Sequence, residues 1–371
     1  MKLQVLQEDF SKAISIASRF TSTRAQLPIL GNILLSASRT KLLIASTNLE
    51  VSISISVGAQ VEKEGEITVP SRVFSDLVSN LPSGQISLQA EKEQLKVSTQ
   101  GFSSSVSGMN SSDFPSVPKI LGKKAIKFSK ENLIDALSQV SFAASIDETR
   151  PILTGVLFIF ERGSLTLVAT DGFRLSQKKI FLKGVKGGRK IILPKNALSE
   201  VSRLSGDTEE LSFSFKDKDS QVVFGLSNAV LSSRILEGEF PSFEKIIPKD
   251  SNYKVNLDRE ELLRAVKLAA VFARDSANIV GVSLKKDLIE ISAESANTGQ
   301  QKTQVDAKVE GNIGKKGFEI NFNYRFLEDL LNALEGEEIQ IEFSNPNAPG
   351  VFTDPKDKNF LHLIMPVRIQ S

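Results

Sequence analysis

The chain has 371 residues, of which 40% are hydrophobic and 24% charged, so it is a globular protein large enough for two or three domains. It has no cysteine, which excludes disulfides, Fe–S clusters, thiolate zinc sites and a cysteine nucleophile, and its single histidine excludes multi-histidine metal sites. The 46 basic residues barely exceed the 44 acidic ones, so the net charge of +2 does not predict a tight grip on nucleic acid.

In chain order, the first element that the pattern predicts is a helix capped by Asp9, after which apolar residues recur at spacings of three and four. Residues 50–61 then alternate Val and Ile with mostly Ser, which is typical of a half-buried strand. A second helix is expected just after Pro70, followed by more strands. Comparable helix starts at Ser129 and Asp258 indicate that this order of elements recurs along the chain.

An internal repeat accounts for this recurrence. The segment LPILGNILL is echoed by RPILTGVLF, with Pro28 and Pro151 at an offset of 123. The turns STNLE and ATDGFRL keep the offset of 123, measured from Thr47 to Thr170. Two further landmarks keep the order at offsets of 124 and 126, namely Pro70 with Pro194 and Phe114 with Phe240.

A third, more diverged copy lacks the PIL motif but repeats the helix and strand patterns over residues 257–275, 278–295 and 320–334. Pro, Lys and Gly cluster where the copies meet. Each copy is expected to place helices on one face of antiparallel sheets, so the predicted fold class is α+β. We therefore expect three domains, at residues 1–121, 125–249 and 252–371.

No group of residues predicts bond chemistry, so we expect no catalytic residue, no metal and no cofactor. Asp171 in ATDGFRL suggests a metal ligand, but Asn48 takes its place in the first copy, and a turn-forming side chain explains both. The basic, Gly-rich residues 183–190 lack the ending of a P-loop and are expected to form a flexible hairpin. His362 lies in an alternating apolar run, which favours a structural role.

Membrane and secretion signals are not expected. The N-terminal segment MKLQVLQEDF lacks a long apolar stretch, so it does not predict a signal peptide. The longest charge-free stretch, residues 97–112, is too short and too rich in Ser and Gly to span a bilayer. We therefore expect a cytoplasmic protein without a membrane partner.

Taken together, the ordered motifs LPILGN, TNLE, VPSRVFSDLVSNLP, DFP, TRPILTGV, ATDGFRL, LPKNAL, EFPSFEKIIP and MPVR resemble the bacterial DNA polymerase III beta subunit family, the sliding clamps. The resemblance covers essentially the whole chain. It implies three domains of the DNA clamp type, with helices on the inner face and antiparallel sheets outside. Two chains would join head to tail in a closed ring around duplex DNA. The function implied is that of a polymerase processivity factor, an accessory subunit without activity of its own.

The resemblance also implies two functional surfaces. DNA-facing cations are expected at Arg24, Arg72 and Lys195, contacting phosphates without reading bases. Linear motifs with a glutamine and apolar side chains are expected to bind a pocket; they come from the polymerase III catalytic subunit, the clamp loader, other polymerases and repair proteins. The pocket positions are Arg150, Leu153, Thr170, Gly172, Arg174, Leu175, Pro241, Ile246, Asn321, Tyr324, Leu363, Met365, Pro366 and Arg368. Leu, Pro, Ile and Met there suit an adaptable apolar cleft.

A head-to-tail ring must pair an edge of the first repeat with an edge of the third. Residues 97–112 carry no charge, although exposed strand edges are usually blunted by charge, so we expect a partner strand from residues 297–305 to cover them. The dimer interface expected is Phe102, Ser104 and Val106 on one side, with Val271 and Phe272 on the other. Two alternatives stay open: a repeat-built module that binds DNA or protein without closing a ring, and an enzyme with an unrecognised site.

Overall fold

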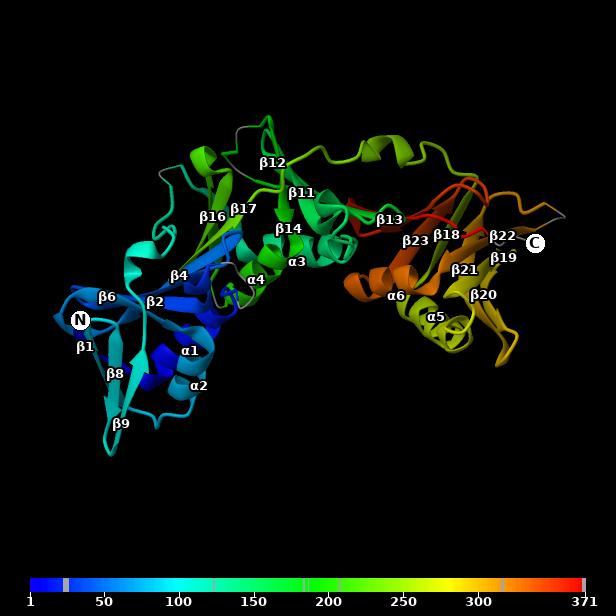
Figure 1. Cartoon of the computed structure of the whole chain (residues 1–371). Helices are drawn as coiled ribbons and strands as arrows, with labels where there is room; N and C mark the ends of the chain where they lie inside the picture. Colours follow the sequence, from blue (N-terminus) through cyan, green and yellow to red (C-terminus); the bar gives the residue numbers. More distant parts are fainter. Residues whose placement is uncertain are drawn as a thin grey trace. The chain divides into compact units, whose positions relative to one another are not determined.

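The computed structural model describes residues 1–22, 27–122, 124–182, 184–185, 187–206, 208–314 and 317–368 (Figure 1). These residues form two compact units. The first unit comprises Met1–Lys130 and Asn196–Ile235, and the second comprises Glu131–Lys195 and Leu236–Ser371.

The first unit contains two antiparallel sheets, with strand orders β5–β1–β7–β8–β9 and β10–β15–β16–β17–β4–β3–β2–β6. The strands of the smaller sheet are β1 (Lys2–Leu6), β5 (Gln60–Lys63), β7 (Gln85–Glu91), β8 (Gln94–Thr99) and β9 (Phe102–Ser107). Those of the larger sheet are β2 (Asn32–Ser38), β3 (Lys41–Thr47), β4 (Val51–Gly58), β6 (Gly65–Pro70), β10 (Ile126–Ser129), β15 (Glu210–Lys216), β16 (Gln221–Leu226) and β17 (Ala229–Arg234).

The helices of the first unit are α1 (Gln7–Ser18), α2 (Ser71–Ser79) and α4 (Lys195–Leu204), of which α4 belongs to this unit from its second residue onward. Helices α1 and α2 pack together through the rings of Phe10 and Phe74, whose centroids are 5.8 Å apart. Both rings are fully buried, so they anchor the core of the first repeat.

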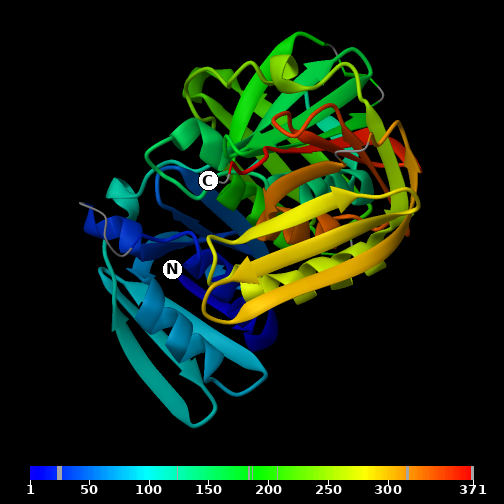
Figure 2. The same ribbon diagram turned by 90° about the vertical axis from the view of Figure 1, so that its right-hand side faces the viewer.

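The second unit is built on one antiparallel sheet of order β14–β11–β12–β13–β25–β24–β23–β18–β21–β20–β19–β22. Its strands are β11 (Gly155–Glu161), β12 (Ser164–Thr170), β13 (Arg174–Phe181), β14 (Arg189–Pro194), β18 (Tyr253–Asp258), β19 (Ile279–Leu284), β20 (Leu288–Ser295), β21 (Gly299–Glu310), β22 (Phe318–Asn323), β23 (Glu338–Phe343), β24 (Gly350–Asp354) and β25 (Asp357–Ile364). Its helices are α3 (Lys130–Ser141), α5 (Arg259–Ala273) and α6 (Tyr324–Ala333), with the first residue of α3 counted in the other unit. Figure 2 shows α5 lying along the hairpin of β20 and β21.

Strand pairing joins neighbouring repeats within each unit. In the first unit β17 pairs with β4, and in the second β13 pairs with β25. The boundary between the two compact units therefore runs through the middle repeat. The three domain boundaries expected from the sequence stay a prediction.

The local expectations are confirmed in part. The half-buried strand expected over residues 50–61 is wrong in its extent and pattern, because β4 ends at Gly58 and buries Ser52 and Ser54 together with its isoleucines. The PIL motif forms the same 3-10 turn in both repeats that carry it, at Pro28–Gly31 and Pro151–Thr154. The expected cap at Asp258 accepts a 2.8 Å hydrogen bond from the backbone N–H of Glu261. The expected cap at Asp9 is wrong, because α1 begins earlier and Asp9 lies in its first turn, where a negative charge still favours the helix dipole.

The single histidine lies in the core of the second unit. His362 is fully buried on β25, stacked on Phe142 with ring centroids 5.3 Å apart and edge-on to Phe352 at 6.5 Å. Neither ring nitrogen has a hydrogen-bond partner among the described residues. Burial, with a smaller effect from the charge of Arg174, lowers the pKa of His362 from 6.5 to about 3.

This burial makes stability depend on pH. Below pH 6.5 His362 is protonated in the unfolded chain, whereas in the folded chain it stays neutral down to about pH 3. The free energy of unfolding therefore falls as the pH drops from 6.5 towards 3. We expect His362 to lower the free energy of unfolding by about 2 kcal/mol between pH 7 and pH 5. Urea unfolding of the native chain and of His362→Phe at both pH values measures this decrease. Equal decreases in the two proteins would contradict it.

Candidate functional site

An apolar cluster covers one face of the second unit's sheet over the strands from β14 to β24. It includes Leu157, Val168, Leu175 and Leu363, all nearly inaccessible, and the register pairs Leu175 of β13 directly with Leu363 of β25. The chain segment at residues 236–247 crosses this face and packs Phe240, Phe243 and Ile247 against the cluster. The cluster is therefore a floor shared by the second and third repeats.

Two apolar side chains that lie close to floor residues in the chain are exposed. Met365 is 36% exposed and Ile246 is 45% exposed. The backbone N–H of Met365 donates to the carbonyl of Phe173 at 2.8 Å, and that of Val367 donates to the carbonyl of Asn321 at 2.8 Å. The end of the described chain is thus held between the turn that leads into β13 and strand β22.

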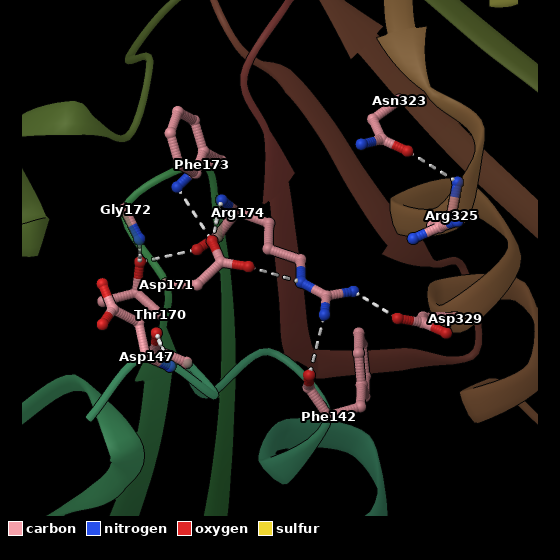
Figure 3. Close-up of polar contacts among 11 residues, drawn as sticks. Phe142, Asp147, Thr170, Asp171, Gly172, Phe173, Arg174, Asn323, Arg325 and Asp329 are labelled. Atoms are coloured by element: carbon pink, nitrogen blue, oxygen red, sulfur yellow. Dashed lines mark hydrogen bonds and ion pairs between the residues drawn. The ribbon is translucent and has the colours of Figure 1, made fainter. Parts of the chain in front are cut away.

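The turn before β13 is fixed by its own polar groups (Figure 3). The Asp171 carboxylate accepts backbone N–H bonds from Phe173 at 2.8 Å and from Arg174 at 3.0 Å. The Thr170 hydroxyl donates to the carbonyl of Arg174 at 2.6 Å and accepts from the N–H of Gly172 at 3.1 Å. Gly172 has a φ of 94°, a conformation that favours glycine. Asp171 therefore acts as the turn-forming residue that the sequence predicted.

The cationic side chain of Arg150 lies beside the turn from Thr170 to Arg174. Its guanidinium lies 3.4 Å from the Asp147 carboxylate and approaches Gly172. Hydrogen bonds from the side chain and backbone of Thr149, with a smaller effect of the Arg150 charge, hold the pKa of Asp147 below its usual value. Arg150 and Asp147 are both about half exposed, so the pair is accessible to solvent.

All fourteen positions expected in the pocket lie in the second unit. Five are buried: Leu153, Thr170, Leu175, Tyr324 and Leu363. Of these, Leu175 and Leu363 belong to the floor, whereas Tyr324 belongs to the core of the third repeat. Others are exposed: Arg150, Gly172, Pro241, Ile246, Met365 and Arg368. The remaining three are partly buried: Arg174, Asn321 and Pro366.

Five residues of the floor were not singled out from the sequence: Leu157, Val168, Ile192, Phe243 and Val351. Phe243 stands within the FPSFEKIIP motif, and its ring meets that of Phe240 edge-on with centroids 6.3 Å apart. Leu157 lies in an apolar strand, where a leucine has the pattern of ordinary core. The motif itself was the available signal for Phe243, whereas nothing in the local sequence distinguishes Leu157.

The expected DNA-facing cations fall in different parts of the chain. Arg24 lies outside the described residues. Arg72 is exposed in the first turn of α2, in the first unit. Lys195 is the first residue of α4 and is partly buried; that burial, followed by the charge of Arg174, lowers its pKa, whereas Asp329 raises it.

The expected joint residues lie on one strand and one helix. Phe102, Ser104 and Val106 belong to β9, the last strand of the five-stranded sheet. Val271 is 59% exposed at the end of α5, and the ring of Phe272 lies beside Gly299, where β21 begins.

In the part of the chain that the structure describes, no group of three or more His, Cys, Asp or Glu residues is arranged to hold a metal ion. No helix among the same residues is long and apolar enough to cross a membrane.

Comparison with known proteins identifies the family. Three successive family models match: the N-terminal, central and C-terminal domains of the DNA polymerase III beta subunit, over residues 1–118, 127–242 and 244–368. The beta sliding clamp of Staphylococcus aureus is 30% identical over 379 residues, with 99% of each chain covered.

Solved structures agree. The DNA polymerase sliding clamp of Bacillus subtilis superposes over the full length of both chains with a TM-score of 0.94 at 28% identity. A Pseudomonas aeruginosa sliding clamp bound to griselimycin shares the fold, with a TM-score of 0.91 over both full chains at 24% identity.

The fold and these matches define a three-domain clamp of mixed helices and antiparallel sheets, which confirms the expected fold class. The chain belongs to the DNA polymerase III beta subunit family, the beta sliding clamps. Its function is that of a processivity clamp in DNA replication, an accessory and not a catalytic subunit.

Proposed function

We propose that two copies of this chain close head to tail into a ring around duplex DNA, and that partner proteins bind the pocket around Met365. The observation that carries the ring is a pair of charge-poor strand edges. Strand β9 ends the five-stranded sheet, and residues 299–306 of β21 pair with β20 on one side, with no strand on the other among the described residues. Each edge offers unpaired main-chain groups to the other.

The end of α5 supports the same joint. Val271 is more than half exposed, and the Phe272 ring packs beside Gly299, so an apolar surface adjoins the free edge of β21. Charges near these edges are few, chiefly Lys302 and Asp306. The proposed joint is therefore held by main-chain hydrogen bonds and apolar contact rather than by ion pairs.

Such a joint should tolerate salt, because screening weakens exposed ion pairs but hardly changes apolar burial. We expect the dimer dissociation constant to change little between low salt and about 0.5 M salt, where the Debye length is a few ångströms. Phe272→Arg should give folded monomers, since it buries an unpaired charge in the joint. Analytical ultracentrifugation measures both, with circular dichroism as the check on folding. Steep dissociation as salt rises would count against this joint.

The proposed DNA contacts are weak. Helices α1 to α6 together carry nine Lys or Arg and ten Asp or Glu, so their surfaces have no large basic excess. We propose that Arg24, Arg72 and Lys195 supply the few phosphate contacts, and that topology rather than affinity retains the DNA. A closed ring is therefore expected to stay on nicked circular DNA and to leave it on linearisation. A repeat-built module that does not form a closed ring would be released from circular and from linear DNA alike.

Replacing Arg24, Arg72 and Lys195 with Ala together should slow loading onto DNA and leave the dimer intact. The salt dependence of DNA binding should flatten by about one unit of slope or less for each phosphate that the protein no longer neutralises. Binding titrations over a salt series measure the slope. The matched control replaces three exposed lysines on strands and turns, Lys63, Lys92 and Lys358, and should keep both the loading rate and the slope. A triple variant that behaves like the control would contradict the assignment.

The pocket suits a linear motif with a glutamine and apolar side chains. Met365 and Ile246 offer exposed apolar surface above the floor, and the half-exposed guanidinium of Arg150 can donate to a partner's backbone carbonyl or glutamine oxygen. We propose the polymerase III catalytic subunit, the clamp loader, other polymerases and repair proteins as the partners, and the cytoplasm as the place of action. The domain boundaries at residues 1–121, 125–249 and 252–371 belong to the same proposal.

Met365→Ala should weaken the binding of a labelled peptide of one glutamine and three apolar residues by about 1–3 kcal/mol, as truncation of an apolar anchor does. Fluorescence anisotropy measures the change. Met109→Ala is the matched control, because Met109 is 40% exposed, close to the 36% of Met365, but lies in the first unit. Leu175→Ala is unsuitable, since Leu175 is fully buried and its truncation would destabilise the fold. Unchanged peptide affinity in a folded Met365→Ala protein would contradict the assignment of this pocket.

A further inference from the structure

A basic surface adjoins the pocket floor on the same face of the sheet. Residues that pair directly across antiparallel strands share a face, and so does every second residue of one strand. Ile192, Leu157 and Val168 form one such row within the floor. Two residues further along each strand, the next row on this face consists of Lys190, Ile159, Thr166 and Lys179. Ile159 packs against the floor, so the two rows are continuous.

A third row on this face ends in an exposed aromatic side chain. Glu161 pairs with Ser164, and Ser164 pairs with Phe181, which is 69% exposed. We call Lys179, Phe181 and Lys190 the basic strip. At about 3.3 Å per residue of strand, its two rows lie about 7 Å and about 13 Å beyond the row of the floor.

The distance from the pocket to the basic strip fits the length of a short peptide. Ile364, which precedes Met365, pairs with Arg174, and Lys179 follows five residues later on the same strand. That separation is about 17 Å at about 3.3 Å per residue. A peptide with four residues in the pocket therefore reaches the basic strip with about four more residues in extended conformation.

Positive charge dominates at this end of the strands. The sequence of residues 178–190 has six Lys or Arg and no Asp or Glu, and two of the six lie outside the described residues. Glu161, in the third row, forms an ion pair of 3.1 Å with Lys179. Both side chains of this pair are exposed, at 53% and 38%, so the pair contributes little and Lys179 can exchange it for another carboxylate. Lys190 is exposed as well.

Glycines hold the turn before β14 against the turn before β12. The N–H of Gly188 donates to the carbonyl of Phe160 at 2.9 Å. Gly187 lies so close to Arg162 that a Cβ there would meet its backbone nitrogen at 2.6 Å. Gly163 and Gly188 have φ of 80° and 99°, a conformation that favours glycine. The described part of this Gly-rich segment therefore fixes the strand ends that carry the basic strip.

We propose that the basic strip binds an acidic segment adjoining a partner's linear motif, so that this clamp favours partners whose motif is flanked by Asp or Glu together with an apolar residue. This inference rests on the proposed pocket and adds the chemistry of the flanking residues. Ile159 belongs to the row of both lysines and packs against the floor, so one peptide can cross from one surface to the other. Lysine attracts carboxylates as a point charge, so the number of acids matters more than their order. The exposed ring of Phe181 offers a contact for the apolar residue.

The test uses the full-length chain and the labelled peptide of one glutamine and three apolar residues. Two longer versions carry three aspartates and a leucine at the N-terminal or the C-terminal end, and two matched versions carry three asparagines and a leucine. At low salt, the aspartate version extended at one of the two ends should bind about five-fold more tightly than its asparagine counterpart, as a few exposed ion pairs allow. Anisotropy titrations measure this ratio, which should fall towards one at about 0.5 M salt.

Replacement of the two lysines tests the assignment. Lys179→Gln combined with Lys190→Gln should abolish the preference for aspartate and leave the affinity of the short peptide unchanged. The matched control combines Lys285→Gln with Lys286→Gln, which removes the same charge from the exposed turn between β19 and β20, and it should keep the preference. The control is matched in pairing too, because Lys285 forms an exposed ion pair as Lys179 does.

Two single variants change binding in opposite directions. Glu161→Gln removes the carboxylate that competes for Lys179, so it should enlarge the preference for the aspartate peptide. Phe181→Ala should weaken the binding of both the aspartate and the asparagine versions and leave the short peptide unaffected.

Equal binding of the aspartate and asparagine versions at both ends would overturn the proposal. So would a preference that survives the loss of Lys179 and Lys190, or one that the control variant loses equally. A short single-stranded oligonucleotide is titrated in parallel. If the double lysine variant loses oligonucleotide binding but keeps the peptide preference, the strip binds nucleic acid and the proposal is wrong. Native protein that fails to bind even the short peptide instead refutes the pocket itself.

Discussion

The need to pair main-chain groups at strand edges is the constraint on which this structure depends. Each repeat ends in strands whose edges need a partner, and neighbouring repeats supply it: β17 closes on β4 within the first unit, and β13 closes on β25 within the second. The sheets still end in strands with one free side, namely β5, β9, β10, β6, β14 and β22, and residues 299–306 of β21 also lack a strand on one side among the described residues. Charge is the usual protection of an edge, and β9 carries none while residues 299–306 carry only Lys302 and Asp306, so these are the two edges that we propose a second copy covers.

The two junctions between repeats share a register but differ in chemistry. At the second junction Leu175 faces Leu363, and both belong to the apolar floor of the pocket. At the offset of 123, the counterpart of Leu175 is Ser52, which faces Ser232 and is hydrogen bonded to it at 2.7 Å. A buried serine pair satisfied within the sheet has no apolar surface to offer a peptide. Duplication alone therefore does not duplicate the apolar floor, because the side chains at this register position differ between the two junctions.

Much of this architecture follows from local sequence. The PIL turn and the prolines before α2 and α4 depend on turn and helix chemistry that acts within a few residues, so the turns and the starts of these two helices were predictable. Contacts between distant segments were not. Asp329 lies 155 positions from Arg174 and in another repeat, and no pattern around either residue indicates the pairing. The resemblance placed Arg174 in the pocket, and the packing of Phe142 and Phe326 shows that its side chain is largely covered.

The balance of charge on the helices fits a clamp that moves. A protein that neutralises many phosphates binds DNA with a steep salt dependence and must break those contacts at every step. The six helices carry about as many acids as bases, and several basic side chains on or beside them are already paired, as in the 3.0 Å contact of Arg19, just after α1, with Glu200. Cations such as Arg19 are thus largely satisfied without DNA. We propose that retention comes instead from a ring closed by two copies. Pairing of the free strand edges with a second copy is then what would make weak contact with DNA sufficient.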